Sequence, residues 1–239
     1  MSDGNQEQRD QVPHRTVSVP TLKRLPLYHR FLKKLAEAGR ISFSCTDIGE
    51  EMELDPTQVR KDLQSAGVVG RPRVGYVLAQ VIPVLEEFLG WHNVRDAFLA
   101  GAGSMGSALL GYRKFEQFGL NIVTAFDTDP EKIGLRVKGK QVLPLDKLTN
   151  LASRMHVQMG IITVPAPEAQ AVADLMVEGG IRAIWNFAPV RLRVPEHVIV
   201  HNEDLYCSLA ELSRKLSESL KSSPGSMKSR KRLQSAAKN

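Results

Sequence analysis

The stretch "LAGAGSMGSALLGY", Leu99–Tyr112, decides the fold of this chain. Gly101, Gly103 and Gly106 have G-x-G-x-x-G spacing, between a run typical of a buried strand ("DAFLAG") and one typical of a helix ("SALLGYRKFEQF"). In such a unit the first glycine permits a tight turn, the second lets backbone amides approach a pyrophosphate, and the third lets helix and strand pack closely. The stretch therefore predicts a dinucleotide-binding loop made of Gly101, Ala102, Gly103, Ser104, Met105 and Gly106.

An acidic residue follows at the distance that such a loop requires. The second expected strand, "NIVTAFD", ends at Asp127, 21 residues after Gly106. A carboxylate there accepts hydrogen bonds from the adenosine ribose hydroxyls and repels a 2′-phosphate, so NAD(H) is favoured over NADP(H). The alternative interpretation is a glycine turn that binds nothing.

Two later turns, "TVPAP" and "NFAPV", follow the carboxyl ends of expected strands, where open α/β sheets bind their ligands. We expect their backbones to line the nicotinamide half of the site; ordinary strand-end turns are the alternative. The residues are Thr163, Val164 and Pro165 in the first turn, and Asn186, Phe187, Ala188 and Pro189 in the second.

The alternation of strands and helices predicts an α/β protein whose residues 93–202 form a Rossmann-like, doubly wound parallel sheet. "MGIITVP", "IRAIWNF" and "HVIVHN" read as strands, and "PEAQAVADLMVEGG" reads as a helix between the first two. Residues 203–220 form a final amphipathic helix. Because only this helix and a tail follow Asn202, we expect no separate substrate domain.

Residues 21–92 predict a winged helix-turn-helix domain. Apolar residues from Leu25 recur at helical spacing, with Pro26 expected in the first turn of that helix. Ser44 and Asp55 suit the N-caps of two further helices, with Gln58 completing a capping-box-like pattern. The glycine-punctuated stretch "VVGRPRVGY" reads as a small hairpin, the wing.

The third of these helices has a polar face opposite Val59 and Leu63, and a helix of this kind reads base edges in the major groove. Two arginines on the expected wing suit phosphates or the minor groove. A solvated charged face is the alternative. The candidate DNA-binding residues are Thr57, Gln58, Arg60, Lys61, Gln64, Arg71 and Arg73.

Charge is concentrated at one end of the chain. The formal net charge of +6 equals the number of basic residues from Lys221 onward, where no acidic residue occurs. Residues 1–20 are expected to be a disordered arm and residues 221–239 a basic disordered tail. No apolar run is long enough for a membrane helix, and Cys45 and Cys207 have no metal or redox spacing. We therefore expect a cytoplasmic protein that binds neither membrane nor metal.

No catalytic apparatus is evident, since none of the six histidines lies in a strand-end motif. We therefore expect that the protein is not an enzyme. One alternative is an NAD-dependent oxidoreductase with a helical appendage, which turnover with a small substrate would reveal. Another is a dinucleotide sensor that acts through protein contacts alone, which would bind no DNA.

Taken together, the motifs resemble the Rex family of bacterial redox-sensing transcriptional repressors over about Thr21–Leu216. The stretches "QVRKDL", "VGY", "GAGSMGSAL", "FDTDPEKIG", "TVPAPEAQAVAD" and "GIRAIWNFAPVRL" follow the family pattern in order and spacing. The chain departs from it at Ser65, Ala66 and Gly67, before the wing, and at Arg73.

The resemblance implies a homodimer that binds an inverted-repeat operator when NADH is low and is released by NADH. It also implies that the last helix is swapped between the two subunits. Three residues match a polar network that links DNA-binding domain, nicotinamide pocket and partner: Arg30, Tyr112 and Asp204. The alternatives are a solvated Arg30, a core ring for Tyr112 and a helix cap for Asp204.

Overall fold

The structure is a computed structural model that describes residues 17–70, 75–92 and 95–222. The chain divides into two compact units. The first comprises Met1–Val94 and Gln117–Gly119, and the second comprises Arg95–Glu116 and Leu120–Asn239. We call these unit 1 and unit 2. The expected wing residues Arg71 and Arg73, most of the expected N-terminal arm and nearly all of the expected basic tail lie outside the described residues.

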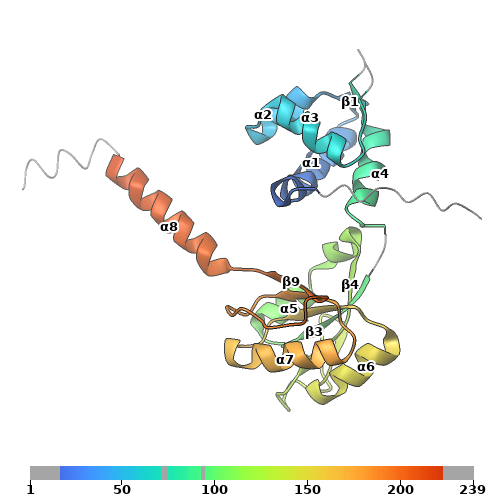
Figure 1. Cartoon of the computed structure of the whole chain (residues 1–239), viewed down its shortest axis with the longest axis vertical. Helices are drawn as coiled ribbons and strands as arrows, with labels where there is room; N and C mark the ends of the chain where they lie inside the picture. Colours follow the sequence, from blue (N-terminus) through green and yellow to red (C-terminus); the bar gives the residue numbers. More distant parts are fainter. Residues whose placement is uncertain (1–16, 71–74, 93–94, 223–239) are drawn as a thin grey trace, which may run out of the picture. The chain divides into compact units, whose positions relative to one another are not determined.

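Unit 1 contains a helix-turn-helix (Figure 1). Its helices are α1 (Val19–Glu37), α2 (Cys45–Met52), α3 (Pro56–Ser65) and α4 (Leu78–Phe88). Two expected caps are confirmed: Ser44 forms a capping box with Asp47, and the Asp55 side chain accepts a hydrogen bond from the amide of Thr57. One apolar core, centred on fully buried residues such as Tyr28 and Leu63, joins the four helices.

The first helix starts earlier than its sequence predicts. Residues 1–20 were expected to be disordered, with Pro26 in the first helical turn. Instead Ser18 caps α1, its side chain accepting a hydrogen bond from the amide of Thr21, and Pro20 occupies the first turn. Pro26 therefore lies inside the helix, and the prediction that it occupies the first turn is wrong. The packing of α1 on α4 and α3 compensates for the backbone hydrogen bond that a proline cannot donate.

The strand pairing described in unit 1 joins the end of the expected wing to a distant segment. β1 (Ser42–Phe43) pairs antiparallel with β2 (Tyr76–Val77), and the rings of Phe43 and Tyr76 stack with centroids 5.2 Å apart. The stretch expected to form the wing ends in β2, whose described partner strand precedes α2; residues 71–74 of the stretch lie outside the described residues. Such a pairing joins residues more than 30 positions apart, so a local turn pattern does not reveal it.

Unit 2 has a seven-stranded sheet in the order β5-β6-β4-β3-β7-β8-β9. All neighbours are parallel except β5 and β6. From β6 to β9 this is the doubly wound order, which reverses between β3 and β7 and confirms the expected sheet. The strands are β3 (Arg95–Ala100), β4 (Leu120–Asp127), β5 (Arg136–Val137), β6 (Lys140–Pro144), β7 (Met159–Ile162), β8 (Ala183–Asn186) and β9 (Ile199–Asn202).

Helices pack on both faces of this sheet, as alternating side chains of β3 show. Phe98 and Ala100 belong to a core shared with α6 and α7, whereas Ala97 and Leu99 belong to a second core with Leu110 of α5. Figure 1 shows these helices around the strands. The connecting helices are α5 (Ser104–Leu110), η1 (Arg113–Phe118), η2 (Leu145–Lys147), α6 (Leu148–Met155) and α7 (Ala166–Glu178).

The last helix, α8 (Leu205–Ser222), carries five leucines on one face: Leu205, Leu209, Leu212, Leu216 and Leu220. All five are between 57% and 64% exposed in the single chain. The opposite face holds ion pairs between Arg214 and Glu218 and between Lys215 and Glu211. No helix among the described residues is long and apolar enough to cross a membrane.

Candidate functional site

A cavity of about 510 Å³ opens where β3, β4 and β7 end. This is the point at which the strand order reverses, and open α/β sheets bind their ligands there. The cavity is lined by Gly101, Gly103, Phe126, Asp127, Thr128, Asp129, Lys132, Leu145, Thr163, Val164, Pro165 and Glu168.

The glycine loop is shaped by backbone contacts that admit no side chain. Gly101 has a φ of +98°, and a Cβ there would lie 2.9 Å from the carbonyl carbon of Thr163. At Gly106 a Cβ would overlap the carbonyl oxygen of Gly101, whereas at Gly103 it would meet nothing within 4 Å. The hydroxyl of Thr163 lies 2.7 Å from the carbonyl oxygen of Gly101 and fixes the loop to the end of β7. The space beside Gly103 is thus open, unlike the space beside Gly101 and Gly106.

Asp127 at the end of β4 is held by the backbone on both sides. Its carboxylate oxygens accept hydrogen bonds from the amides of Ala102, at 2.8 Å, and Asp129, at 2.9 Å. Lys132 Nζ lies 3.4 Å from Asp127 and 3.1 Å from Asp129. The ammonium group of Lys132 lowers the pKa of Asp129, which in turn raises the pKa of Lys132. The expected acidic end of the pocket therefore contains a cation as well.

Of the predicted loop residues, Gly101 and Gly103 line the cavity, Ala102 and Gly106 are buried, and Ser104 and Met105 are exposed on α5. The sequence reasoning did not identify Lys132 as a pocket residue. It lies five positions after Asp127, within the same stretch "FDTDPEKIG". Other lining residues that were missed include Thr128, Asp129, Leu145 and Glu168, which carry no local pattern of their own.

The turn after β8 does not line this cavity but is fixed to the start of α8. The buried side chain of Asn186 donates hydrogen bonds to the carbonyl oxygens of Ala188 and Val190 and to the side chain of Asn202. The amide of Glu203 donates to the carbonyl oxygen of Asn186. Asn186 thus holds the turn in shape, and the chain just before α8 is tied to it.

A chain of aromatic rings continues from this turn. Phe187 contacts Trp185 with ring centroids 4.8 Å apart, Trp185 contacts Phe115 at 5.7 Å, and Phe115 contacts Tyr112 at 4.8 Å. The indole N–H of Trp185 also donates a hydrogen bond to Glu203 at 3.0 Å. Tyr112, half exposed, therefore lies at the end of a packed row that leads back to the turn and to the start of α8.

In unit 1, α3 presents a polar, exposed face. Val59 and Leu63 are completely buried, and Thr57, Arg60, Lys61 and Gln64 are exposed, as the sequence pattern predicts. Gln58 differs, because its side-chain amide donates to Asp62 at 2.9 Å rather than completing a capping box. Gln58 therefore serves the structure of the domain.

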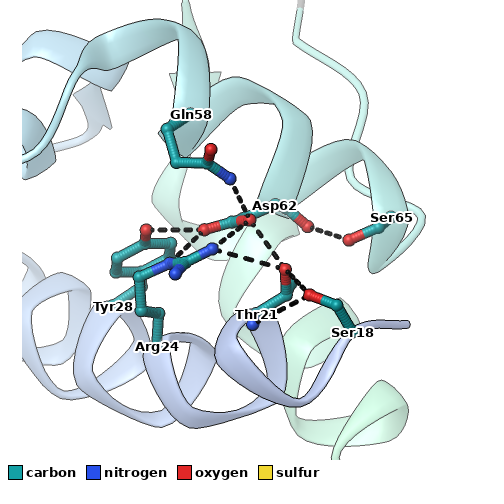
Figure 2. A network of polar contacts seen from close by, with 7 residues as sticks. All are labelled: Ser18, Thr21, Arg24, Tyr28, Gln58, Asp62 and Ser65. Carbon is teal, nitrogen blue, oxygen red and sulfur yellow. Dashed lines mark hydrogen bonds and ion pairs between the residues drawn. The ribbon is translucent and has the colours of Figure 1, made fainter.

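Asp62 fixes α3 on α1 through a polar network (Figure 2). Its carboxylate accepts hydrogen bonds from Thr21 at 3.0 Å, from Tyr28 at 2.8 Å, and from Arg24 Nε and Nη2 at 2.7 and 2.9 Å. Burial opposes ionisation of Asp62, but these hydrogen bonds outweigh it and lower the pKa of the carboxyl group. The hydrogen bond to Asp62 raises the pKa of Arg24, and burial together with the hydrogen bond to Asp62 raises the pKa of Tyr28. The result is a satisfied buried charge that orients α3.

The three residues of the expected polar network lie on separate elements. Arg30 is exposed on α1 and Tyr112 is exposed after α5. Asp204 caps α8: its carboxylate accepts hydrogen bonds from the amide of Cys207 at 2.9 Å and from the Cys207 thiol at 3.0 Å. The thiol and amide of Cys207 lower the pKa of Asp204. In the single chain Asp204 thus has the capping role that was one of the alternatives.

Comparison with known proteins supports both units. Residues 16–64 match a family described as "Putative DNA-binding protein N-terminus", and residues 92–190 match "CoA binding domain". The crystal structure of RSP in complex with β-NAD⁺ and operator DNA is 34% identical, covers 85% of this chain and 94% of its own, and has a TM-score of 0.81. For RSP with β-NADH the identity is 33%, the coverage 85% and 96%, and the TM-score 0.77.

These units define a transcriptional regulator that combines a DNA-binding domain with a Rossmann-like domain. This chain is similar to two proteins named redox-sensing transcriptional repressor Rex along nearly their whole length. That of Bacteroides thetaiotaomicron is 44% identical, over 84% of this chain and 91% of the relative. That of Clostridium beijerinckii is 37% identical, over 86% and 98%. The chain belongs to the Rex family of redox-sensing transcriptional repressors.

Membership of this family makes the chain a regulator and not an enzyme, because its relatives are named as repressors. In the part of the chain that the structure describes, no group of three or more metal-ligating side chains occurs.

Proposed function

We propose that this protein represses transcription by binding operator DNA when NADH is low, and that NADH releases it. The observation that carries this proposal is the pairing of an exposed recognition helix in unit 1 with a glycine-loop cavity at the sheet reversal in unit 2. The RSP structures with operator DNA and with β-NADH support the same pair of ligands. The dinucleotide then acts as a signal, and DNA binding by unit 1 is the response to it.

The test is fluorescence anisotropy of labelled promoter DNA from upstream of its own gene, with NADH, NAD⁺ or no ligand. We expect tight binding without NADH and dissociation as NADH is added. A hundredfold loss of operator affinity requires NADH to prefer the DNA-incompetent state by about 2.8 kcal/mol. Operator binding that is insensitive to NADH would contradict the proposed switch, and no binding at all would favour a sensor that acts through protein contacts alone.

The ligand proposed for the cavity is NAD(H). The backbone amides beside Gly103 suit the pyrophosphate, and Asp127 suits the adenosine ribose hydroxyls. The turn at Thr163–Pro165, which lines the cavity, and the turn at Asn186–Pro189, which lies outside its lining, are proposed to hold the nicotinamide half through their backbones. Because Lys132 neutralises part of the acidic charge at Asp127 and Asp129, the repulsion of a 2′-phosphate is weaker than the acid alone would give.

Cofactor preference should shift in opposite directions in two variants. Asp127→Ala is expected to weaken NADH binding by about 1–3 kcal/mol, since one or two ribose hydrogen bonds are lost, and to lower the preference for NADH over NADPH. Lys132→Gln, the matched control on the same loop, should raise that preference by removing the cation. Isothermal calorimetry with both dinucleotides measures the change. Equal preference in the two variants would show that neither side chain faces the ribose.

The proposed DNA contacts are those on the exposed face of α3, with Thr57, Arg60, Lys61 and Gln64 in the major groove. Arg71 and Arg73, which lie outside the described residues, remain proposed wing contacts. Gln58 is proposed at the edge of this face, where one N–H of its side-chain amide is bonded to Asp62.

The proposed assembly is a homodimer in which α8 packs against a second copy of the chain. Five leucines along one face of this helix are exposed among the residues that the structure describes, so a second copy can cover them. Burying each of them is worth roughly 1.5–3 kcal/mol. A two-fold axis also explains an inverted-repeat operator, because each recognition helix then reads one half-site.

Coupling between the ligands is proposed to run through Asp204, at the start of α8. This residue pairs with Arg30 in the DNA-competent dimer and turns toward Tyr112 when the pocket closes on NADH. The hydrogen bonds from Asn186 to Asn202 and from Trp185 to Glu203 connect the turn after β8 to the segment just before α8. Each ligand state then has contacts of its own, as allostery requires.

Two substitutions of Asp204 separate coupling from capping. Asp204→Asn removes the charge but keeps a good N-cap, whereas Asp204→Ala removes both. We expect both variants to bind NADH normally and to need at least tenfold more NADH to release operator DNA. Titration of operator-bound protein, with NADH affinity measured separately, gives the result. Normal release by Asp204→Asn together with a less stable Asp204→Ala would leave Asp204 as a helix cap only.

A further inference from the structure

Asp62 and Gln58 lie on the flank of α3, between its exposed face and its buried face. One helical turn separates them, so their side chains point the same way, and they hydrogen bond to each other. Lys61, the residue before Asp62, belongs to the exposed face, and Leu63, the residue after it, is completely buried. Whatever side chain from α1 pairs with Asp62 is therefore placed beside the recognition surface.

That side chain is Arg24, as Figure 2 shows. Its Nε and Nη2 donate to the two carboxylate oxygens of Asp62, and Nη2 also lies 3.4 Å from the hydroxyl of Thr21. A guanidinium group has five N–H donors in a rigid plane. Among the hydrogen bonds of residues 17–70, 75–92 and 95–222, none is donated by Nη1, although the Tyr28 hydroxyl also lies close enough to the guanidinium to raise the pKa of Arg24; the Arg24 side chain is 23% exposed. The two N–H groups of Nη1 are therefore not used in the bonds to Asp62 and Thr21.

A helix in the major groove has a phosphate backbone on each side, so cations on its flanks meet phosphates and those on its outer face meet bases. We propose that Arg24 binds a DNA phosphate through Nη1 while Asp62 holds its other edge. This inference rests on the proposed DNA-binding function of unit 1. It adds a contact from α1, outside the recognition helix and the wing.

The fixed position of Arg24 matters as much as its charge. A buried carboxylate beneath a DNA-binding surface would repel the polyanion, and Arg24 cancels that charge at the point where phosphates approach. A bidentate pair also removes most of the rotamer freedom of the arginine before DNA arrives, so less entropy is lost on binding. Asp62 is accordingly a positioning residue for Arg24.

The experiment uses the double variant Arg24→Gln/Asp62→Asn in the full chain. It leaves the net charge unchanged and replaces the ion pair with uncharged groups of similar shape, so the domain need not bury an unpaired charge. Affinity for operator and for random-sequence DNA is measured across a salt series, after a melting curve confirms folding. We expect roughly tenfold weaker binding to both DNAs and a slope of log K against log salt that is smaller by about 1 for each subunit bound.

Wild-type affinity and slope in the double variant would overturn the proposal and leave Arg24 as a counter-ion for Asp62 only. Arg24→Lys serves if the double variant does not fold. A lysine keeps the charge but loses the two-pronged geometry, so the proposal expects weaker binding with an unchanged slope, and a mere counter-ion role expects wild-type affinity. Arg60→Ala, a control for base contact, should instead lose affinity mainly on operator DNA. Absence of DNA binding by the wild-type chain would contradict the proposed function itself.

Discussion

Replacement of Gly106 by alanine is expected to abolish dinucleotide binding and to destabilise unit 2. An alanine Cβ would overlap the carbonyl oxygen of Gly101, a backbone atom that is itself fixed by the Thr163 hydroxyl. Because a backbone atom cannot move aside as a flexible side chain can, the loop must separate from the start of α5. We expect a loss of at least 2 kcal/mol in the free energy of unfolding, within the range of overpacked cores at about 1–3 kcal/mol. Thermal melting and NADH calorimetry measure the two effects.

Gly103→Ala is the matched control, three residues away on the same loop. Its Cβ would meet nothing within 4 Å, so the melting temperature should match that of the wild type. NADH affinity should nevertheless fall at least tenfold, because the new methyl group occupies the space proposed for the pyrophosphate. Wild-type NADH affinity in Gly103→Ala would place the dinucleotide elsewhere, and wild-type stability in Gly106→Ala would contradict the contact described here.

The second large effect is expected from Leu212→Asp, in the middle of the leucine face of α8. If the homodimer forms through this face, the substitution removes about 1.5–3 kcal/mol of apolar burial from each subunit and adds the cost of a buried, unpaired charge. We expect a monomer at micromolar concentrations and at least hundredfold weaker binding to a two-half-site operator. Light scattering after gel filtration measures the mass, and anisotropy measures the affinity.

Ser217→Asp introduces the same charge on α8 but off the leucine face, so it should remain dimeric with normal operator affinity. A dimeric Leu212→Asp would show that α8 does not form the interface. A monomeric Leu212→Asp that still binds the full operator tightly would show instead that half-sites are read independently.

The features that could be predicted from the sequence are those determined by neighbouring residues. Ser44 and Asp55 were recognised as caps, because a capping side chain acts within three residues of itself. The strand–glycine–helix unit at Leu99–Tyr112 and the acid at Asp127 were found for the same reason, since the spacing along the chain is itself the requirement. The doubly wound order followed from the alternation of strands and helices.

Contacts between distant segments could not be predicted in this way. Asp62 is bonded to residues 34 to 41 positions earlier, and nothing near "QVRKDL" shows that its acid is buried rather than solvated. The start of α1 was misplaced because Pro26 suggested a first turn, whereas Ser18 supplies the cap. Lys132 was overlooked because its role depends on the folding of its loop back onto Asp127.

The Asp62 network also limits how the operator specificity of this protein can be redesigned. Exchange of α3 alone for the recognition helix of another regulator would leave Arg24, Tyr28 and Thr21 of α1 facing a position with no carboxylate. The transplanted helix would then lack the ion pair and hydrogen bonds that fix α3 on α1. A functional graft must therefore either keep Asp62 and Gln58 and vary only the outward-facing positions of α3, or transfer α1 together with α3.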